Sequence, residues 1–511
     1  MNRVARYSGW LRLPLLGSLG AVAALGQAPW VMPFATVAAL VAMFLLPAAR
    51  PRVAFINGWA FGAGYFALAL HWITQPFMVD VDRYGWMAPF ALVLLAGGLA
   101  LFWGGAFALA RAAGGGKLAL VTCWTVAELA RSLLFTGFPW ALIGHVWIDT
   151  PLAQLAAFVG PHGLTLLTLA AAAIMAQRRL WKAPVVLAPI ALAPVVLAGI
   201  GWWALNPGPA FAPDASAPLI RLVQPNVPQS EKWDPDLAMR NIQRMLALSA
   251  GQGEGPAPAG LVIWPESSVP WIMDQAQSIL QSASQAASGA PVILGIPRRD
   301  GDHYYNALAL LDPTGTVSAV YDKTHLAPFG EYIPFGDLLS RFGIYGLADT
   351  QGGGWSAGIG LSLIEVPGIG PVLPLICYEG IFAEEVNAVQ GRARLMVLIT
   401  NDAWFGTDSG PYQHFALARL RAIEQGLPLA RVANTGVSGM IDARGRVLGQ
   451  IGLGQQAELT IALPPALPPT LYVRLGDWPV QVLLVLLGLA LILGRLRDVW
   501  RITVDPIGTG D

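Results

Sequence analysis

The sequence predicts a two-part protein, a membrane α-helical bundle of eight spans and an extracytoplasmic α/β domain placed before the last span. Composition is the first reason for this prediction. The chain of 511 residues is 55% hydrophobic and 12% charged, which is about half the charged fraction of ordinary soluble domains. Distribution is the second reason, because long apolar runs fill the first 206 residues and recur only near the C-terminus. Short β-branched runs alternating with helical patterns between them are the third.

Apolar runs of about 20 residues can cross a bilayer as helices. Seven are predicted before residue 206, and an eighth lies near the C-terminus. The first two are short and are separated only by Gln27-Ala28-Pro29, which predicts a tight hairpin. The predicted spans are 10–26, 29–47, 53–73, 88–110, 118–136, 152–176, 184–204 and 478–494.

Basic residues beside these runs predict their orientation. The loop at 74–87 holds Asp80, Asp82 and only Arg83, whereas the loops on the other side are basic. By the positive-inside rule both termini are then cytoplasmic, and seven spans place residues 206–477 outside the cytoplasm. No cleavage site follows the first run, so it is predicted to be an anchor rather than a removed signal peptide. The basic clusters are Arg3 with Arg6, Arg50 with Arg52, Arg111 with Lys117, Arg178 with Arg179 and Lys182, and Arg495 with Arg497.

Two charged residues lie inside the fifth predicted span. Glu128 and Arg131 are one helical turn apart, which predicts an ion pair on one helix face. Charges within a membrane are costly and are often functional. A structural pair is nevertheless the favoured interpretation, with a substrate contact as the alternative.

The predicted domain boundaries follow from these patterns: a membrane bundle at 1–206, a linker at 207–218, an α/β domain at 219–470, and a last span with a cytoplasmic tail at 471–511. The glycine-rich segment 343–360 is predicted to be a loop.

Predicted strands are Leu219–Val227, Leu261–Pro265, Pro291–Pro297, Asn306–Leu311, Val317–Tyr321, Val372–Ile376, Leu395–Thr400, Leu429–Ala433 and Ser438–Ile441. Predicted helices are Asp236–Ser249, Met273–Ser288, Ile381–Gln390 and Tyr412–Gln425. Strands alternating with helices favour α/β layers with helices outside the sheets.

Charge and cysteine content exclude several classes of protein. The formal net charge is zero, so nothing indicates a nucleic-acid partner. The only two cysteines are Cys123, in an apolar run, and Cys377, so no disulfide framework is predicted. No metal-ligand spacing is evident, and neither a metal nor another cofactor is predicted.

Three residues in the α/β region carry most of the chemical signal. Glu266, Lys323 and Cys377 each close a hydrophobic strand. A thiol needs help to ionise, and a carboxylate beside it can accept its proton as a general base. An ammonium favours the thiolate and can face the oxyanion of a tetrahedral intermediate, a donor typically worth about 3–4 kcal/mol in acyl transfer. Glu331, eight residues after Lys323, could hold that lysine charged and oriented.

The motifs around these residues resemble the nitrilase superfamily with its Glu-Lys-Cys triad. They are Trp-Pro-Glu at 264–266, Tyr-Asp-Lys-Thr-His-Leu-Ala-Pro-Phe-Gly-Glu at 321–331 and Cys-Tyr-Glu at 377–379. With the membrane spans and the Asn401-Asp-Ala-Trp-Phe-Gly stretch, the chain resembles the bacterial apolipoprotein N-acyltransferase family.

The resemblance implies an αββα nitrilase-like sandwich on the periplasmic side of the bacterial inner membrane. It implies that an acyl chain passes from a phospholipid, commonly phosphatidylethanolamine, to the α-amino group of the diacylglyceryl-cysteine of an apolipoprotein. On this basis Cys377 is the nucleophile, Glu266 the base and Lys323 the oxyanion partner. The resemblance further implies support from Glu331, Tyr378 and Glu379, and substrate contacts from Trp233 and Trp404.

Two alternatives remain open at this point. A membrane-anchored amidase or nitrilase would use the same three residues with water as the acceptor. A transporter or receptor with an extracytoplasmic sensor domain is the second alternative, although paired discontinuous helices and internal symmetry are not evident.

Overall fold

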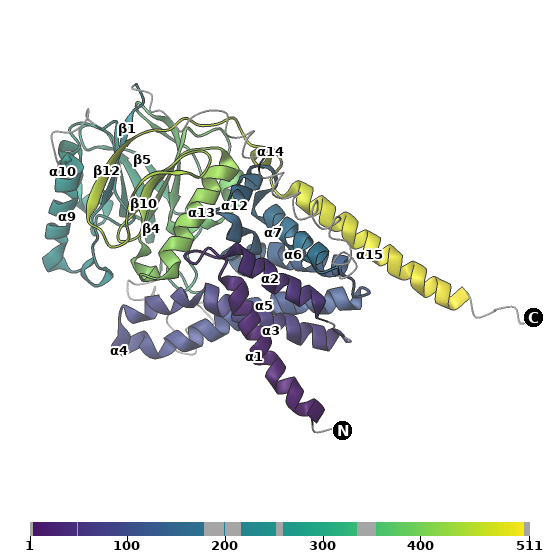
Figure 1. The fold of residues 1–511 in the computed structure, drawn as a ribbon. Coiled ribbons are helices and arrows are strands. Elements are labelled where there is room, and N and C mark those ends of the chain that lie inside the picture. The colour runs from purple at the N-terminus through teal and green to yellow at the C-terminus, as the bar shows by residue number, and fades with distance from the viewer. Residues whose placement is uncertain are drawn as a thin grey trace, which may run out of the picture. The chain divides into compact units, whose positions relative to one another are not determined.

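The computed structural model describes residues 4–46, 48, 50–177, 199, 216–251, 259–334 and 354–504. The chain divides into two compact units. One consists of Met1–Asn206 with Leu471–Asp511, and the other of Pro207–Thr470. Figure 1 shows the first unit as helices and the second as sheets flanked by helices.

The first unit is helical throughout its described elements. Every predicted span within the described residues coincides with a helix, whereas the predicted span at 184–204 lies outside them except for residue 199. The longer helices are α1 (Val4–Ala24), α2 (Pro33–Leu45), α3 (Pro51–Ala69), α5 (Ala88–Ala112), α6 (Lys117–Leu133), α7 (Ala156–Met175) and α15 (Trp478–Val504). Shorter elements are η1 (His71–Met78), α4 (Val81–Tyr84), η2 (Gly85–Met87), η3 (Leu134–Thr136), η4 (Ile143–Trp147), η5 (Pro151–Leu155) and α14 (Leu471–Leu475).

Helix length separates the described spans into two groups. Four helical segments are long and apolar enough to cross a membrane, or five if α3 and η1, bent by 47°, form one span. The 13-residue α2 rises only about 20 Å at 1.5 Å per residue, less than a hydrocarbon core of about 30 Å. The chain reverses before α2, where the Met32 N–H donates to the Leu25 carbonyl at 2.9 Å, as the predicted hairpin requires. The total of eight spans remains a prediction.

Glycines allow α1 and α3 to pack backbone against backbone. A Cβ atom at Gly64 would overlap the Gly17 main chain, and one at Gly20 would overlap the Phe61 carbonyl. Small residues at helix crossings favour close association in membranes, where hydrophobic burial between helices contributes little.

The predicted Glu128–Arg131 pair is confirmed. Arg131 Nη2 lies 3.0 Å from Glu128 Oε2, and both side chains are fully buried. Trp103 Nε1 donates to Glu128 Oε1 at 2.6 Å, and Arg131 Nη1 donates to the Trp140 carbonyl at 2.8 Å. These contacts support the structural interpretation, because they hold an irregular segment against α6.

The second unit contains two six-stranded sheets with the orders β12-β1-β2-β3-β4-β5 and β11-β10-β9-β8-β7-β6. In each sheet three central strands are parallel, β1 to β3 in one and β7 to β9 in the other. The first-sheet strands are β1 (Leu219–Gln224), β2 (Leu261–Ile263), β3 (Val292–Asp300), β4 (His303–Leu311), β5 (Val317–Asp322) and β12 (Ala457–Ala462). The second-sheet strands are β6 (Ile364–Val366), β7 (Gly370–Ile376), β8 (Leu395–Thr400), β9 (Leu429–Ala433), β10 (Ser438–Ile441) and β11 (Val447–Ile451).

Three hydrophobic cores define four layers. The central core joins the sheets, with Ile263 and Leu308 of the first packed against Val397 of the second. A second core covers the outer face of the first sheet with α9 (Pro235–Ala250) and α10 (Gln277–Ala286). A third covers the second sheet with α12 (Ala383–Asn387) and α13 (Ser409–Gln425). Figure 1 shows α9 and α10 together on one side of the domain and α13 on another. The predicted nitrilase-like α/β sandwich is therefore the observed architecture of this unit.

Several element boundaries differ from the prediction. Strands β6, β11 and β12 were not predicted, because they are short or only half-buried and their patterns are weak. The helix predicted at Met273–Ser288 is interrupted at Ala276, whose φ of −102° and ψ of 11° are not helical. The helix predicted at Ile381–Gln390 shortens to α12. The predicted loop at 343–360 lies partly outside the described residues, and its part from 354 onward has no regular structure.

Candidate active site

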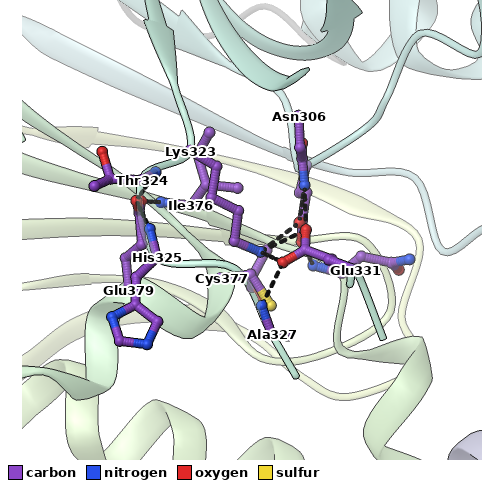
Figure 2. A network of polar contacts seen from close by, with 12 residues as sticks. Asn306, Lys323, Thr324, His325, Ala327, Glu331, Ile376, Cys377 and Glu379 are labelled. Carbon is purple, nitrogen blue, oxygen red and sulfur yellow. Dashed lines mark hydrogen bonds and ion pairs between the residues drawn. The ribbon is translucent and has the colours of Figure 1, made fainter. Parts of the chain in front are cut away.

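The candidate site lies where the carboxyl ends of strands from both sheets meet. Glu266 follows β2, Lys323 follows β5, and Cys377 follows β7. Strand β5 runs in the same direction as β3, because two antiparallel pairings separate them. The carboxyl ends of β2 and β5 therefore share one edge, the edge at which α/β sheets commonly bind ligands. Figure 2 shows Lys323, Glu331 and Cys377 close together at this place.

Glu266 is buried and both of its carboxylate oxygens accept hydrogen bonds. Oε1 accepts from Asn306 Nδ2 at 2.7 Å, and Oε2 accepts from the Asn401 N–H at 2.8 Å. The backbone of β3 approaches closely, so that a Cβ atom at Gly295 would lie 2.7 Å from the Glu266 Cα. The carboxylate thus has a fixed direction.

Lys323 forms the centre of a buried charge network and is only 1% exposed. Its Nζ lies 2.8 Å from Glu331 Oε2 and 3.5 Å from Glu266 Oε1. Burial by itself would lower the pKa of Lys323, but the charges of Glu331 and Glu266 outweigh burial and raise the pKa above its ordinary value. The lysine is therefore a permanent cation at neutral pH.

Asn306 joins the two carboxylates that flank the lysine. Its Nδ2 donates to Glu266 Oε1 and, at 3.0 Å, to Glu331 Oε1. Its main-chain carbonyl accepts from the Lys323 N–H at 2.9 Å. One residue of β4 therefore sets the spacing among Glu266, Lys323 and Glu331. Figure 2 shows Asn306, Lys323 and Glu331 together. An asparagine within a strand carries no distinct signal, so the sequence does not predict Asn306.

Cys377 occupies a sharp turn between β7 and η10 (Cys377–Ile381). Its φ is +52°, a left-handed conformation that non-glycine residues adopt only when their surroundings impose it. Burial and the Glu266 carboxylate raise the pKa of the Cys377 thiol, although the charge of Lys323 acts in the opposite direction. The sequence predicts that the lysine favours the thiolate. In the structure burial has the larger effect, so the resting group is a thiol that requires a base.

Glu379 connects the Cys377 turn to the loop that follows Lys323. Its Oε2 accepts from the Ile376 N–H at 2.7 Å, while Oε1 accepts from the Tyr321 hydroxyl at 2.6 Å and the Thr324 N–H at 2.7 Å. The carboxylate is fully buried and joins the ends of β5 and β7 across the two sheets. Glu379 therefore fixes the positions of Lys323 and Cys377 relative to each other (Figure 2).

Tyr378 packs rather than projecting into solvent. Its ring contacts those of His325 and Phe382 at centroid distances of 5.5 Å and 5.1 Å. Burial raises the pKa of the Tyr378 hydroxyl above its ordinary value, so the ring remains neutral. The side chain thus supports the turn from behind.

Lys232 is a second buried lysine beside the site, which the sequence analysis missed. Its Nζ donates to the Glu266 main-chain carbonyl at 3.0 Å. Burial lowers the pKa of Lys232 to about 8, although the charges of Glu266 and Cys377 oppose this change. The family resemblance indicates its neighbour Trp233 instead.

The two predicted substrate-binding tryptophans lie on the periphery of this network. Trp233 follows η7 (Gln229–Glu231) and keeps 37% of its surface exposed. Trp404 lies in η11 (Asp402–Phe405), three residues after the Asn401 that contacts Glu266, and is half-buried. Their contact with an acyl chain remains a prediction.

Comparisons with known proteins cover both units. A family model for the apolipoprotein N-acyltransferase N-terminal domain matches residues 19–174, and one for carbon-nitrogen hydrolases matches residues 219–466. The apolipoprotein N-acyltransferase of Rhodopseudomonas palustris is 37% identical, covering 95% of this chain and 96% of its own. That of Bradyrhizobium diazoefficiens is 37% identical over 94% of each chain. Among solved structures, an amidase from Nesterenkonia sp. shares 20% identity over 52% of this chain and 96% of its own, with a TM-score of 0.37.

Proposed function

The chain belongs to the apolipoprotein N-acyltransferase family, and on that premise we propose that it acylates apolipoproteins through a thioester on Cys377. Family membership makes the protein an acyltransferase of lipoprotein biosynthesis and a multi-pass inner-membrane protein. The donor in this proposal is a phospholipid, with phosphatidylethanolamine as the expected one. The acceptor is the α-amino group of an N-terminal diacylglyceryl-cysteine.

The observation that carries the mechanism is the convergence of one base, one cation and one thiol at the strand ends. Glu266 is held by Asn306 and by the Asn401 N–H, so its carboxylate cannot swing away. Lys323 is held by Glu331 with its ammonium charged. Cys377 is fixed on a strained turn. Such preorganisation favours a reaction in which negative charge develops next to the lysine.

In the first half-reaction the Cys377 sulfur attacks the ester carbonyl of the phospholipid while Glu266 takes the thiol proton. The carbonyl oxygen becomes an oxyanion that faces Lys323 and the main-chain N–H after Cys377. Collapse of this intermediate breaks the ester C–O bond, and Glu266 returns its proton to the departing glycerol oxygen. The products are a thioester on Cys377 and a lysophospholipid.

In the second half-reaction the neutral α-amine of the acceptor attacks the thioester carbonyl. Glu266, again a carboxylate, takes the proton that the amine loses. The C–S bond then breaks, the sulfur leaves and regains a proton, and an amide is released. The lysophospholipid leaves before the acceptor attacks the acyl-enzyme, which gives ping-pong kinetics, and the same base acts in both half-reactions.

Lipid substrates are consistent with a catalytic domain belonging to a membrane protein. Extracting an acyl chain into water costs roughly 0.8 kcal/mol per CH₂ group. An enzyme anchored in the bilayer avoids most of this cost. The periplasmic placement of the domain belongs to the same proposal and is supported by the basic clusters that flank the predicted spans.

Transfer can be measured with purified full-length protein, a phospholipid labelled in its sn-1 chain and a synthetic diacylated lipopeptide. The expected product is a triacylated peptide, formed by the wild type and not by Cys377→Ala. Release of the labelled chain only as free fatty acid would contradict the proposal and favour a membrane-anchored amidase or nitrilase.

A second experiment tests on which side of the membrane the α/β domain lies. Asp302 is exposed at the turn between β3 and β4. Asp302→Cys, in a chain whose two natural cysteines are replaced by serine, is expected to react with a membrane-impermeant maleimide in intact spheroplasts. Labelling only after the membrane is permeabilised would place the domain in the cytoplasm.

A further inference from the structure

A buried polar cluster lies behind Cys377 and takes no part in the mechanism described so far. It contains Thr400 at the end of β8, Asp402 in η11, His414 in α13 and Arg431 in β9, all fully buried. Arg431 Nη2 donates to Asp402 Oδ2 at 2.7 Å, and the Thr400 hydroxyl donates to Asp402 Oδ1 at 2.9 Å. A Cβ atom at Gly436 would overlap the Asp402 carboxylate, so this cluster needs close main-chain packing.

His414 connects the cluster to the nucleophile. Its Nε2 lies 3.1 Å from the main-chain oxygen of Cys377. A carbonyl oxygen only accepts, so Nε2 must carry a proton. On its other side Nδ1 lies 2.9 Å from Arg431 Nη2 and 3.0 Å from Asp402 Oδ1. The ring is therefore held at both nitrogens and cannot flip.

The charge state of the cluster agrees with this geometry. Burial opposes the ionisation of Asp402, but the charge of Arg431 outweighs it and lowers the pKa of Asp402 to about 2, so Asp402 is a carboxylate. Burial, together with the charge of Arg431, lowers the pKa of His414 below its ordinary value. The ring is then neutral with its proton on Nε2, and Nδ1 accepts from Arg431.

The held oxygen determines where the next N–H points. The Cys377 carbonyl and the Tyr378 N–H belong to the same peptide unit, which is planar and trans, so the two groups point in opposite directions. A hydrogen bond that turns the carbonyl toward His414 therefore turns the Tyr378 N–H away from α13. Without this bond the left-handed Cys377 could relax, and the peptide plane could rotate.

We infer that His414 is a positioning residue that fixes the Cys377–Tyr378 peptide so that the Tyr378 N–H serves as an oxyanion donor. Arg431, itself held by Asp402, donates to Nδ1 and so holds His414 in the required tautomer. The inference rests on the proposed acyl transfer through Cys377, but it concerns only the first chemical step. His414 itself touches neither the thiol nor the substrate carbonyl in this scheme.

Two reagents separate this role from a general structural one. Iodoacetamide alkylates the thiol by direct displacement, with no tetrahedral intermediate and no oxyanion. A p-nitrophenyl ester acylates the same thiol through a tetrahedral intermediate. Both rates are measured on full-length protein in detergent for the wild type, His414→Leu and His414→Gln. Ile423→Ala, a truncation at a buried position of the same helix, serves as the control for lost stability.

His414→Leu is expected to lower ester acylation by about 10- to 100-fold, since loss of an oxyanion donor typically costs 10²- to 10³-fold and here the donor is displaced rather than removed. Alkylation by iodoacetamide should change by less than about threefold on the same reasoning. His414→Gln, whose amide can donate to the same carbonyl, should recover part of the ester rate. Ile423→Ala should leave the ratio of the two rates unchanged.

Equal losses of both rates in His414→Leu, or no recovery in His414→Gln, would overturn the positioning role. Wild-type protein that is acylated by the ester but transfers nothing from phospholipid to lipopeptide would contradict the proposed function and leave this inference standing. Wild-type protein that is alkylated but never acylated would contradict both.

Discussion

The helical unit and the α/β unit each bury an ion-pair cluster, and the two clusters are built differently. In the helical unit Glu128 and Arg131 are one turn apart on the same helix, and their contacts with Trp103 and Trp140 hold neighbouring segments in place. In the α/β unit Glu266, Lys323 and Glu331 come from separate segments, and a cysteine on a strained turn lies beside them. The contacts of the first cluster hold helices and loops together, whereas the second cluster lies beside a thiol that can react.

This difference teaches that burial of charge does not by itself indicate a catalytic site. Both clusters are buried, and both hold a carboxylate next to a cation. What distinguishes the α/β cluster is the cysteine beside it, whose pKa responds to the charges of both Glu266 and Lys323. Substitutions that remove one group from either cluster therefore test the comparison: they should impair acylation in the α/β unit and stability in the helical unit.

The largest expected effect is that of Cys377→Ala. Removal of the sulfur leaves the base and the cation with nothing to activate, so transfer should fall by about 10⁴-fold or more, as for other enzymes that lose their nucleophile. Transfer of labelled acyl chains to the lipopeptide measures this effect. Cys123→Ser, which alters the cysteine of the helical unit, should retain transfer; an equal loss there would contradict the assignment.

Lys323→Met should have the next largest effect, about 10²- to 10³-fold on acylation, because an oxyanion donor is removed. The formation rate of lysophospholipid in a single turnover is the appropriate measurement. A variant that loses acceptor binding while lysophospholipid forms at the wild-type rate would show that the lysine acts elsewhere.

Arg131→Met should show the opposite pattern. Removing one partner of a buried pair typically costs about 3–5 kcal/mol of stability, because the Glu128 charge is left uncompensated. Acylation per folded molecule should remain within about twofold of the wild type on the same argument. Thermal unfolding in detergent and active-site titration together test both parts, and a selective loss of acylation would give this pair a catalytic role.

Glu331→Gln should reduce acylation by about 10- to 100-fold, the range expected for losing a hydrogen bond to a charged group. The pKa of Lys323 should fall, because its closest negative partner is gone. The ammonium should then move toward Glu266, its other carboxylate partner. A Glu266 carboxylate bound to the lysine is a weaker base for the thiol. Glu331→Asp, which keeps the charge, serves as the matched comparison, and equal losses in both would favour a purely steric role.

The smallest expected effect is a change of the pH profile in Lys232→Met. Burial lowers the pKa of Lys232 to about 8, so this lysine loses its charge as the pH rises through about 8. The acylation rate of the wild type should therefore change by about twofold across this pH range, a small effect because Lys232 contacts the Glu266 main chain rather than its carboxylate. This step should be absent both from Lys232→Met, which is always neutral, and from Lys232→Arg, which is always charged. A step that persists in Lys232→Met would mean that the charge of Lys232 has no influence and that the lysine only supports the Glu266 main chain.

The sequence predicted the parts of the site that depend on local patterns. Glu266, Lys323 and Cys377 could be found because each ends an apolar strand within a short motif. Asn306, Lys232 and His414 could not, since their contacts join residues 40, 34 and 37 positions apart in the sequence, which only the folded domain brings together. The same limit applies to β12, which exists only because β1 offers it an antiparallel edge.

The central claim is that an acyl chain rests on Cys377 between donor and acceptor. The most direct measurement is the intact mass of purified protein incubated with phospholipid and no acceptor, followed by peptide mapping. The wild type should carry one added acyl chain on Cys377 that hydroxylamine removes and lipopeptide discharges. An enzyme that forms triacylated peptide at full rate, yet never shows this adduct under single-turnover sampling, would contradict the account.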